Sequence, residues 1–444
     1  MNAGTIYAPS TGGGPAGIAV IRVSGPGSGP ALQRLTGAAP PPPRRATLVG
    51  FHDPDSGEVL DRGLVLWFPA PASFTGEDMV ELHVHGGRAV MDGILAALGR
   101  CPGLRPAEAG DFTRRAFANG KMDLTAAEGL ADLIGAETAA QRKQALRQMQ
   151  GELGRVYDSW RRRLLTALAH MEAAIDFSDE ELPDGILERV REDADGLDGE
   201  IAAHLRDGRR GERLRDGLHI AIIGPPNAGK SSLLNLLARR DAAIVSAAAG
   251  TTRDVIEVHL DLGGYPVVVA DTAGLRDGGD AVDREGVRRA RARAREAELK
   301  LAVFDGETWP ERDAETERLV DCDTVVVVNK SDLGLPAGPL EVNGRPALPV
   351  SALTGDGIDG LLRALETEMA ARCPAGAAPS LTRARHRQAL EECRAALSRC
   401  RDAGQVELAA EDLRLAVRSL GRITGRVDVD DILDVIFQDF CIGK

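Results

Sequence analysis

The sequence predicts an α/β plus all-α fold, with two α/β domains and a discontinuous helical domain built from two separated stretches. Short alternating apolar and polar runs, broken by glycine and proline, fill roughly the first 120 residues and indicate a compact α/β domain. Apolar residues at helical spacing follow from 124 to about 215 and return after 379. Between these stretches, strand-like and helical runs alternate from about 218 to 373, which is typical of a doubly wound, mostly parallel sheet.

The composition is that of an ordinary globular chain and excludes several classes of protein. Its 444 residues allow two to four domains, and no apolar run reaches the 18 residues expected of a membrane helix. A net charge of −13 argues against wrapping of nucleic acid by the whole surface. The six cysteines are dispersed without a C-x-x-C pair, and no leader opens the chain, so we expect a reduced, cytoplasmic protein without a zinc site or membrane span.

The first domain is expected to contain strands at 17–23 and 79–85. In the second of these, alternation places Glu81, His83 and His85 on the face opposite the apolar side chains. Such a face is either solvated or lines a small-molecule pocket. A metal site at the two histidines is disfavoured because no third ligand has a suitable spacing.

Each helical stretch has an apolar face. In the first stretch, one side of the predicted helix carries apolar residues at spacings of three and four: Leu164, Leu168, Met171 and Ile175. In the second, one face carries Leu390, Cys393, Leu397 and Cys400, so we expect these two cysteines to be structural. Segments centred on Leu413 and Ile432 are amphipathic as well. The simplest assembly folds the two stretches together around an inserted domain, because domain termini often lie close together.

A phosphate-binding loop follows the first strand of the inserted domain. Residues 224–231 (GPPNAGKS) fit G-x-x-x-x-G-K-[ST], directly after the apolar run 219–223 and before the helical run 232–237. The glycines let backbone N–H groups surround phosphate oxygens, and the helix N-terminus adds its dipole. We predict that Lys230 neutralises phosphate charge and that the Ser231 hydroxyl is a Mg²⁺ ligand.

Three further segments at strand ends predict a guanine nucleotide. Residues 271–274 (DTAG) follow the strand 267–270, where a carboxylate can hold Mg²⁺ through water and a glycine N–H can contact the γ-phosphate. Residues 329–332 (NKSD) follow the strand 324–328, and the Asp332 carboxylate can accept guanine N1–H and N2–H₂, which adenine does not present together. Ser351 and Ala352 then supply backbone N–H to guanine O6. The combination favours GTP over ATP.

Together these segments resemble the translation-factor class of P-loop GTPases over about 140 residues. Residues 250–254 (GTTRD) correspond to the first switch, with Thr252 as second Mg²⁺ ligand. Leu275 occupies the place of the water-orienting glutamine of Ras-like enzymes, so we predict that K⁺ supplies positive charge, with Arg253 or Arg276 as the alternative. The K⁺ ligands would be Asn227, Ser246, Ala248 and Thr251. The full predicted GTP-binding set is Asn227, Ala228, Gly229, Lys230, Ser231, Ser232, Ser246, Ala247, Ala248, Ala249, Gly250, Thr251, Thr252, Asp271, Thr272, Ala273, Gly274, Asn329, Lys330, Asp332, Ser351 and Ala352.

Outside the GTPase domain, three segments resemble the MnmE (TrmE) family of tRNA wobble-uridine modification GTPases. They are residues 73–87 (SFTGEDMVELHVHGG), residues 112–134 around NGKMDL, and the terminal CIGK at 441–444. The resemblance runs from end to end of the chain. It implies an enzyme that, with the flavoprotein MnmG, adds a carboxymethylaminomethyl or aminomethyl group to carbon 5 of the wobble uridine of certain tRNAs.

The resemblance also implies a folate-binding N-terminal domain that carries 5,10-methylenetetrahydrofolate or its 5-formyl analogue. The positions that match folate contacts are Arg22, Glu81, Lys121 and Lys444. Cys441 matches a cysteine with a catalytic role. The family's catalytic glutamate falls at Asp283, whose side chain is one methylene shorter, so the neighbouring Glu285 is an alternative. For Arg22, Glu81 and Lys121, surface ion pairing is the competing interpretation.

The expected architecture has four segments: a folate-binding domain at 1–119, helical segments at 120–212 and 376–444, and an inserted P-loop GTPase domain at 213–375. We expect a homodimer that works with MnmG and tRNA and has no membrane contact. Basic clusters at 161–163, 206–210 and 284–295 either contact tRNA phosphates or form ion-paired helix faces. The competing functions are a ribosome-assembly GTPase switch and a membrane-remodelling GTPase.

Overall fold

The computed structural model describes residues 4–176, 186–240, 243, 257–271, 297–335, 340–372, 379–427, 433–434, 436–437 and 440–443. The chain forms two compact units, each assembled from separated segments. Unit 1 comprises Met1–Ala131, Gln148–Arg191 and Arg399–Lys444, and unit 2 comprises Asp132–Arg147 and Glu192–Ser398. Both helical stretches therefore contribute to both units. Among the described helices, none is long and apolar enough to cross a membrane.

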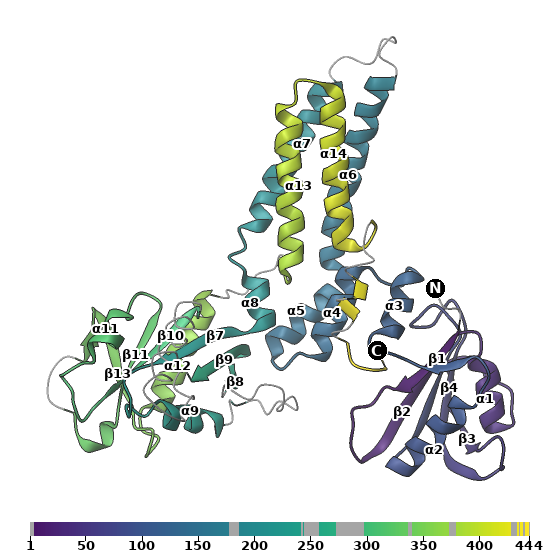
Figure 1. Cartoon of the computed structure of the whole chain (residues 1–444), viewed down its shortest axis with the longest axis horizontal. Helices are drawn as coiled ribbons and strands as arrows, with labels where there is room; N and C mark the ends of the chain where they lie inside the picture. Colours follow the sequence, from purple (N-terminus) through teal and green to yellow (C-terminus); the bar gives the residue numbers. More distant parts are fainter. Residues whose placement is uncertain are drawn as a thin grey trace, which may run out of the picture. The chain divides into compact units, whose positions relative to one another are not determined.

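Unit 1 begins with a six-stranded sheet of order β3-β4-β5-β2-β1-β6 (Figure 1). Its strands are β1 (Thr5–Pro9), β2 (Ala16–Ser24), β3 (Thr47–His52), β4 (Val59–Phe68), β5 (Met79–Gly86) and β6 (Leu104–Pro106). All neighbouring strands pair antiparallel except β1 and β6, which pair parallel. The helices α1 (Ser28–Thr36) and α2 (Arg88–Gly99) pack against the sheet through one apolar core. The strands predicted at 17–23 and 79–85 are confirmed as β2 and β5.

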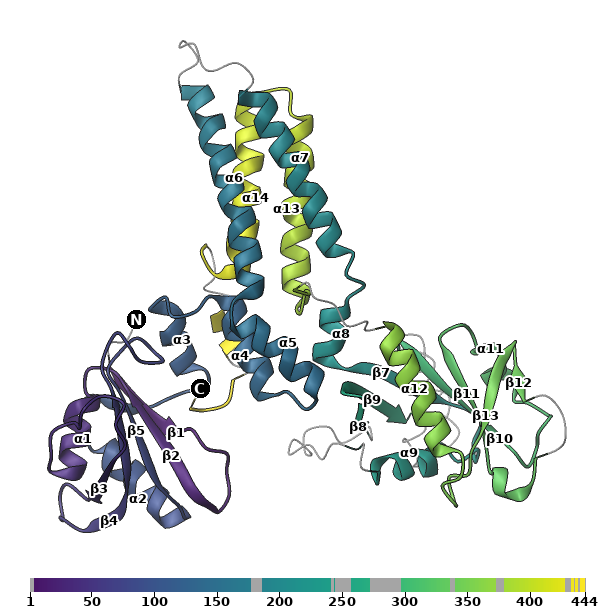
Figure 2. The same cartoon turned by 180° about the vertical axis from the view of Figure 1, so that it is seen from behind.

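The helical part of unit 1 contains α3 (Asp111–Ala118), most of α4 (Leu124–Ile134), α6 (Glu152–Asp176) and α14 (Val406–Thr424). In both views α6 and α14 lie side by side along their lengths (Figures 1 and 2). The buried line of α6 is Trp160, Leu164, Ala167 and Met171. In the predicted apolar stripe, Leu164 and Met171 are buried and Leu168 and Ile175 are half-buried.

The C-terminal segment packs onto α3 and α4 of the same unit. Ile436, Phe437 and Phe440 form one core cluster with Leu124 and Ala127 of α4. Gly110, just before α3, has a φ of +74°, and a Cβ there would lie 2.5 Å from the Phe437 carbonyl oxygen. Glycine is therefore required for this close approach. Burial of the three C-terminal apolar residues fixes the chain end on unit 1.

Unit 2 contains a seven-stranded sheet of order β12-β13-β11-β10-β7-β9-β8. Its strands are β7 (Leu218–Ile223), β8 (Glu257–Leu262), β9 (Tyr265–Asp271), β10 (Leu299–Asp305), β11 (Thr324–Asn329), β12 (Glu341–Val342) and β13 (Arg345–Pro349). The five central strands, from β13 to β9, are parallel, whereas β12 and β8 are antiparallel edges. This confirms the predicted doubly wound, mostly parallel sheet.

Apolar layers cover both faces of this sheet. Along β10, Leu299, Leu301 and Val303 face a core shared with α9 (Lys230–Ala238) and α12 (Ile358–Arg372). The alternate residues Ala302 and Phe304 face a second core. That core lies beside the short helix α11 (Ala314–Arg318) and contains Trp309 and Val320. Burial on both faces explains why the strands read as continuous apolar runs rather than alternating ones.

The remaining helices of unit 2 are α5 (Ala139–Met149), α7 (Ile186–Leu205), α8 (Arg210–Asp216) and α13 (Ala384–Asp402), of which α5, α7 and α13 extend into unit 1. In α13 the predicted face is buried throughout, at Leu390, Cys393, Leu397 and Cys400. Two arginines of α13 are ion-paired: Arg387 contacts Asp207 and Glu212, and Arg394 contacts Asp198. Both of these arginines of α13 are therefore neutralised by carboxylates of unit 2.

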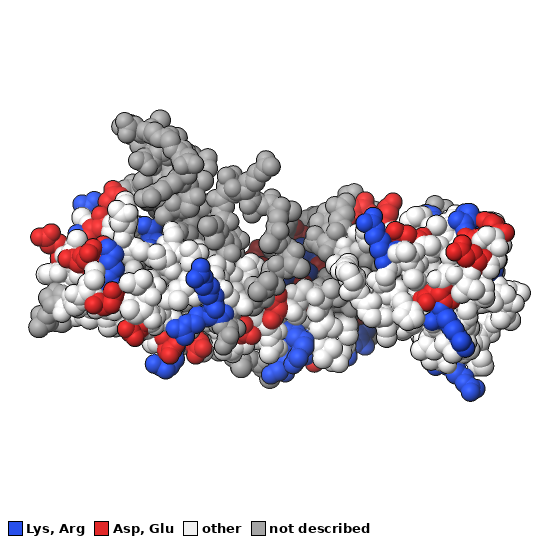
Figure 3. All heavy atoms as spheres, turned by 90° about the horizontal axis from the view of Figure 1, so that it is seen from below, with Lys and Arg blue, Asp and Glu red and all other residues white. Residues whose placement is uncertain are grey.

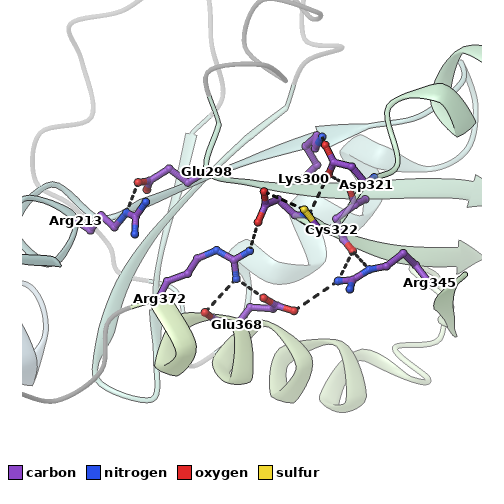
Figure 4. A network of polar contacts seen from close by, with 10 residues as sticks. Arg213, Glu298, Lys300, Asp321, Cys322, Arg345, Glu368 and Arg372 are labelled. Atoms are coloured by element: carbon purple, nitrogen blue, oxygen red, sulfur yellow. Dashed lines mark hydrogen bonds and ion pairs between the residues drawn. The ribbon is translucent and has the colours of Figure 1, made fainter. Parts of the chain in front are cut away.

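A network of ion pairs joins α12 to the amino ends of the central strands (Figure 4). Arg372 contacts Glu368 on its own helix and Asp323 just before β11, the latter at 2.7 Å. Glu368 lies 3.7 Å from Arg345 of β13, whose guanidinium also donates to the Thr324 carbonyl oxygen. The network lies at the strand starts, so it positions α12 without occupying the opposite sheet edge, where the predicted loops lie.

Candidate functional site

The predicted phosphate loop lies between the carboxyl end of β7 and the start of α9. Gly224 and Gly229 have φ values of +153° and +90°. A Cβ at Gly224 would lie 2.3 Å from the Val303 carbonyl oxygen, and one at Gly229 would lie 2.1 Å from Asn329 Nδ2. Both positions therefore require glycine for backbone conformation and for space. The loop cannot close beside β10 and β11 with any other residue at these two positions.

Lys230 occupies the first position of α9 and is almost fully buried. Its ammonium donates to the carbonyl oxygens of Gly224 and Pro225, at 2.9 and 2.8 Å. The Lys230 side chain thus folds back across the phosphate loop, which directly precedes α9. An ammonium held at this point, together with the helix dipole, favours binding of a polyphosphate.

Asn329 joins the phosphate loop to the predicted base-binding loop. It is 2% exposed, at the end of β11. Its Nδ2 donates to the Ala228 carbonyl oxygen at 2.8 Å, and its Oδ1 accepts from the Ala352 N–H at 2.9 Å. A single buried amide therefore satisfies one acceptor and one donor from two different loops. This places 224–230, 329–332 and 351–352 at one edge of the sheet, as predicted.

Asp332 is held by the loop that follows β13. The hydroxyl of Ser351, which is fully buried, donates to Asp332 Oδ1 at 2.5 Å and accepts from the Thr354 N–H at 3.1 Å. One carboxylate oxygen is thereby fixed by the protein while the residue itself is exposed. A carboxylate oriented in this way can accept two parallel N–H bonds from a guanine edge.

Two acidic residues at this site were missed by the sequence analysis. Lys330, with a φ of +62°, donates to Asp305 Oδ2 at 2.7 Å and to Glu307 Oε2 at 2.8 Å. The hydrogen bond to Asp305, followed by that to Glu307, raises the pKa of Lys330 above its ordinary value. Asp305 ends β10 and is the register partner of Asn329 on β11. The end of a third parallel strand was the signal that could have indicated this partner.

Several predicted residues lie outside the described part of the chain. For the second phosphate segment, the structure describes the backbone of Asp271 at the end of β9. The predicted residues outside the described ranges are Ser246, Ala247, Ala248, Ala249, Gly250, Thr251, Thr252, Thr272, Ala273, Gly274, Asp283 and Lys444, together with the alternatives Arg253, Arg276 and Glu285.

A second candidate site lies on the sheet of unit 1. Arg22 of β2 and Glu81 of β5 are register partners, and Arg22 Nη2 lies 2.9 Å from Glu81 Oε1. Their side chains are only 12% and 18% exposed. The Arg22 guanidinium lies 5.3 Å from the ring centroid of Phe74 and 5.7 Å from that of Phe112. The pair is thus partly enclosed by aromatic rings rather than fully solvated.

The C-terminal tail reaches this second site. Ile442 forms a bridge with Ala109, and the Gly443 carbonyl oxygen accepts from Ser10 Oγ at 3.1 Å and from Arg22 Nη1 at 3.5 Å. A Cβ at Gly443, whose φ is +96°, would lie 2.0 Å from the Pro9 carbonyl oxygen. Cys441, two residues earlier, is exposed. The tail therefore brings the Gly443 carbonyl oxygen to Arg22, two residues after a solvent-accessible thiol.

The two motif segments of the N-terminal half pack on each other. Asn119 Nδ2 donates to the Thr75 carbonyl oxygen at 2.8 Å, and Arg115 lies 2.8 Å from Glu77. Lys121 Nζ donates to the Pro71 carbonyl oxygen at 3.0 Å. Lys121 and Arg22 thus both contact the loop at 69–78, Arg22 through Phe74.

The histidines of β5 project from the predicted face but differ in their surroundings. His83 Nε2 lies 3.6 Å from Glu81 Oε2, and His85 Nδ1 lies 2.8 Å from Asp61 Oδ1. Burial raises the pKa of Asp61, but hydrogen bonds from the backbone and ring of His85 outweigh it, so the net pKa is lowered. The His85 ring therefore has a carboxylate partner within the sheet.

The cysteines also separate by environment. Cys101, Cys393 and Cys400 are buried, and burial raises the pKa of Cys393 to about 12. Cys322 and Cys441 are exposed. The Cys393 thiol therefore remains protonated at neutral pH, and the burial of both Cys393 and Cys400 agrees with a structural role. Of the described cysteines, Cys322 and Cys441 are accessible to a reactant.

The parallel sheet, the lysine-containing phosphate loop and the aspartate-containing base loop define the class of GTP-binding P-loop GTPases. Family models then match nearly the whole chain: the N-terminus of the GTP-binding protein TrmE matches residues 5–121, and the MnmE helical domain matches residues 124–441. The chain therefore belongs to the MnmE family of tRNA modification GTPases.

Full-length relatives agree with the family models. The chain is 60% identical over 440 residues to the tRNA modification GTPase MnmE of Paramagnetospirillum magneticum, covering 99% of each chain. It is 53% identical over 466 residues to the human mitochondrial 5-taurinomethyluridine-[tRNA] synthase subunit GTPB3, covering 99% of this chain and 93% of that one. Similarity thus extends over all the predicted domains.

Solved structures match a smaller part of the chain. Era of Aquifex aeolicus bound to GDP and AlF4 is 27% identical, covers 40% of this chain and 66% of its own, and gives a TM-score of 0.28. The G domain of the FeoB iron transporter of T. maritima is 22% identical, covers 34% of this chain and 98% of its own, and gives a TM-score of 0.26. The family assignment does not rest on these two matches.

Proposed function

We propose that this chain hydrolyses GTP to drive, together with MnmG, the addition of a carboxymethylaminomethyl or aminomethyl group to carbon 5 of the wobble uridine of certain tRNAs. The single observation that carries the GTPase half is the buried Asn329, which links the phosphate loop to the base loop. Membership of a family of tRNA modification GTPases supports the second half.

The proposed nucleotide site uses Lys230 and the loop N–H groups for the phosphates and Asp332 for the guanine edge. Space beside Gly229 is closed to any side chain, which suits a loop that receives phosphate oxygens on its N–H groups. Ser231, in the first turn of α9, and Thr252 would hold Mg²⁺. The metal would neutralise charge on the β- and γ-phosphates. The other residues that we propose to bind GTP are those that the sequence motifs predict.

For hydrolysis we propose Asp283 as the residue that orients the attacking water, with K⁺ bound by Asn227, Ser246, Ala248 and Thr251. Asn227 has a φ of +67° in the loop that precedes α9. Turnover in KCl is expected to exceed turnover in NaCl by about tenfold or more, because a cation at the transferring phosphate stabilises developing charge. Equal rates in the two salts would remove K⁺ and leave Arg253 or Arg276 as the positive charge.

For the folate, we propose that Arg22, Glu81, Lys121 and Lys444 bind a one-carbon tetrahydrofolate. Two observations support the proposal: the Arg22–Glu81 pair is partly enclosed, and Phe74 and Phe112 offer rings beside it. A carboxylate can accept from pterin amino groups, and cations can pair with the folate carboxylates. The folate would supply the one-carbon unit. We propose that Cys441 is a catalytic residue of this folate site. We also propose that the chain forms a homodimer.

The experiment that tests the whole proposal is nucleoside mass spectrometry of tRNA from a deletion strain. Complementation with the wild-type chain is expected to restore the carbon-5 modification. Complementation with Lys230→Ala or with Arg22→Met is expected to leave the tRNA unmodified. GTP turnover separates the two variants, because Lys230→Ala removes phosphate binding and Arg22→Met leaves the nucleotide site intact. Unmodified tRNA with the wild-type chain would contradict the proposal and favour a ribosome-assembly switch.

A further inference from the structure

Four arginines of unit 1 surround a hollow that the GTP and folate sites do not use. Its volume is about 450 Å³, and it is lined by Arg155, Asp158, Arg161, Arg162 and Arg426, which we name the arginine pocket. The volume lies in the range of small-ligand sites, which is roughly 300–1,000 Å³. Four of the five lining residues are cationic, in a chain whose net charge is −13. This local excess distinguishes the pocket from the chain as a whole.

The pocket is built by two elements that are distant in sequence. Spacings of three and four residues place Arg155, Asp158 and Arg162 on one side of α6. Arg426 comes from the turn after α14, where its N–H donates to the Gly421 carbonyl oxygen at 2.8 Å. A Cβ at Gly421 would lie 2.2 Å from Val427 Cγ2 and 3.5 Å from Arg161 Nε. Glycine at this position therefore leaves room for the turn that delivers Arg426.

The one carboxylate among the lining residues does not neutralise the pocket. Asp158 Oδ2 lies 3.1 Å from Arg426 Nη2, and its backbone oxygen accepts from Arg162 Nε at 3.3 Å. Arg155 donates to the Gln150 carbonyl oxygen at 3.3 Å. Arg161 Nε is buried and has no hydrogen-bond partner among the described residues. This buried nitrogen is closed to an external ligand, so the exposed guanidinium groups of Arg155 and Arg162 are the donors that an anion can reach.

Arg387 and Arg414 differ from the four arginines of the pocket. Arg387 contacts two carboxylates, and Arg414 of α14 contacts both Glu172 and Glu411. On the face drawn in Figure 3, basic and acidic side chains are interspersed rather than gathered by sign. An ion-paired, solvated helix face is therefore an adequate account of Arg387 and Arg414 but not of the arginine pocket.

We propose that the arginine pocket binds a phosphodiester group of the tRNA substrate; this rests on the proposed function of the chain in tRNA modification. Planar guanidinium groups donate pairs of hydrogen bonds that match phosphate oxygens, and they also stack on nucleobases. A pocket larger than a bare phosphate, with arginines on several sides, suits a nucleotide unit within a strand. Contacts of this kind position a tRNA without reading its sequence.

The test compares tRNA binding by the full-length chain with and without the pocket charges. Arg155→Gln/Arg162→Gln changes two exposed positions of α6 to a residue of similar helix propensity, so the helix is retained. The affinity for tRNA is expected to fall about tenfold, and the slope of log affinity against log salt is expected to become shallower by about 0.7–0.9, the change for one phosphate contact. Arg426→Gln is expected to weaken binding independently. GTP turnover and the unfolding temperature serve as readouts that should not change.

A charge-matched control removes two arginines elsewhere on unit 1. Arg88→Gln/Arg414→Gln alters side chains that are 95% and 49% exposed and lie outside the pocket, and it should bind tRNA as the wild-type chain does. Equal losses in both double variants would show a net-charge effect and overturn the pocket. Titration with inorganic phosphate tests whether the pocket binds a free anion instead of a phosphate of tRNA. If the pocket variants lose phosphate binding but keep wild-type tRNA affinity, the pocket serves a free anion and the proposal is wrong.

The outcome for the wild-type chain separates this proposal from the proposed function. If the wild-type chain binds no tRNA, both are overturned. If it binds tRNA and the pocket variants bind with the same affinity and salt slope, only the arginine pocket is refuted.

Discussion

Replacing Asp332 with asparagine is expected to lower the affinity for GTP by about a hundredfold or more and to transfer the preference to xanthosine triphosphate. Ser351 fixes one oxygen of Asp332 at 2.5 Å, so the carboxylate is preorganised to accept the two N–H groups of guanine. An asparagine in the same orientation keeps one acceptor for N1–H but presents an amide donor where guanine also presents a donor. Xanthine carries an oxygen at that position and restores the match.

Competition between GTP and xanthosine triphosphate for the purified chain measures this change. Asp359→Asn is the matched control, because it removes one carboxylate from the same domain at a position that is 73% exposed and pairs with Arg240. The control is expected to bind GTP as the wild-type chain does. Retention of full GTP preference by the Asp332 variant would show that guanine is read by other groups.

Replacing Gly229 with alanine is expected to abolish nucleotide binding and to lower the free energy of unfolding by about 2–4 kcal/mol. The left-handed φ of +90° costs a residue with a side chain about 1–2 kcal/mol. The added methyl group would also lie 2.1 Å from Asn329 Nδ2, so the buried amide must move away from Ala228 and Ala352. Leaving such groups unpaired costs about 1–3 kcal/mol.

Chemical denaturation and titration with a GTP analogue measure the two effects separately. Gly360→Ala is the control, because Gly360 lies within α12, has no positive φ and has nothing within 4 Å of an added Cβ. That variant is expected to be as stable as the wild-type chain or about 0.5–1 kcal/mol more stable. An alanine at 229 that binds nucleotide normally would disprove the requirement for glycine in the loop.

The sequence predicted that the loops 224–230, 329–332 and 351–352 lie together, because each is a short contiguous segment at the end of a strand. The conformations of Gly224 and Gly229 are local properties, and the apolar strands 219–223 and 324–328 are long enough to be recognised. Asp305 and Glu307 were missed because their role depends on β10 lying beside β11, which brings them to Lys330. Strand order is a property of the packed sheet.

In the helical parts, too, the sequence did not reveal which residues packing would bury. Periodicity identified α6 as amphipathic, but the buried line runs through Trp160 and Ala167 rather than Leu168 and Ile175. Several successive positions of α6 are apolar, so several helix faces were compatible with the sequence. Packing against α14 selected one of them.

The sequence by itself determined the class of nucleotide and the family, because phosphate and guanine recognition need particular residues at fixed spacings along the chain. Only the tertiary structure decided which distant residues meet. It joins Gly443 to Arg22 across 421 positions and Arg426 to Asp158 across 268. The physical reason is that periodicity records which side of an element is buried but carries no information on its partner. The partner is selected by shape and charge complementarity after the elements have formed.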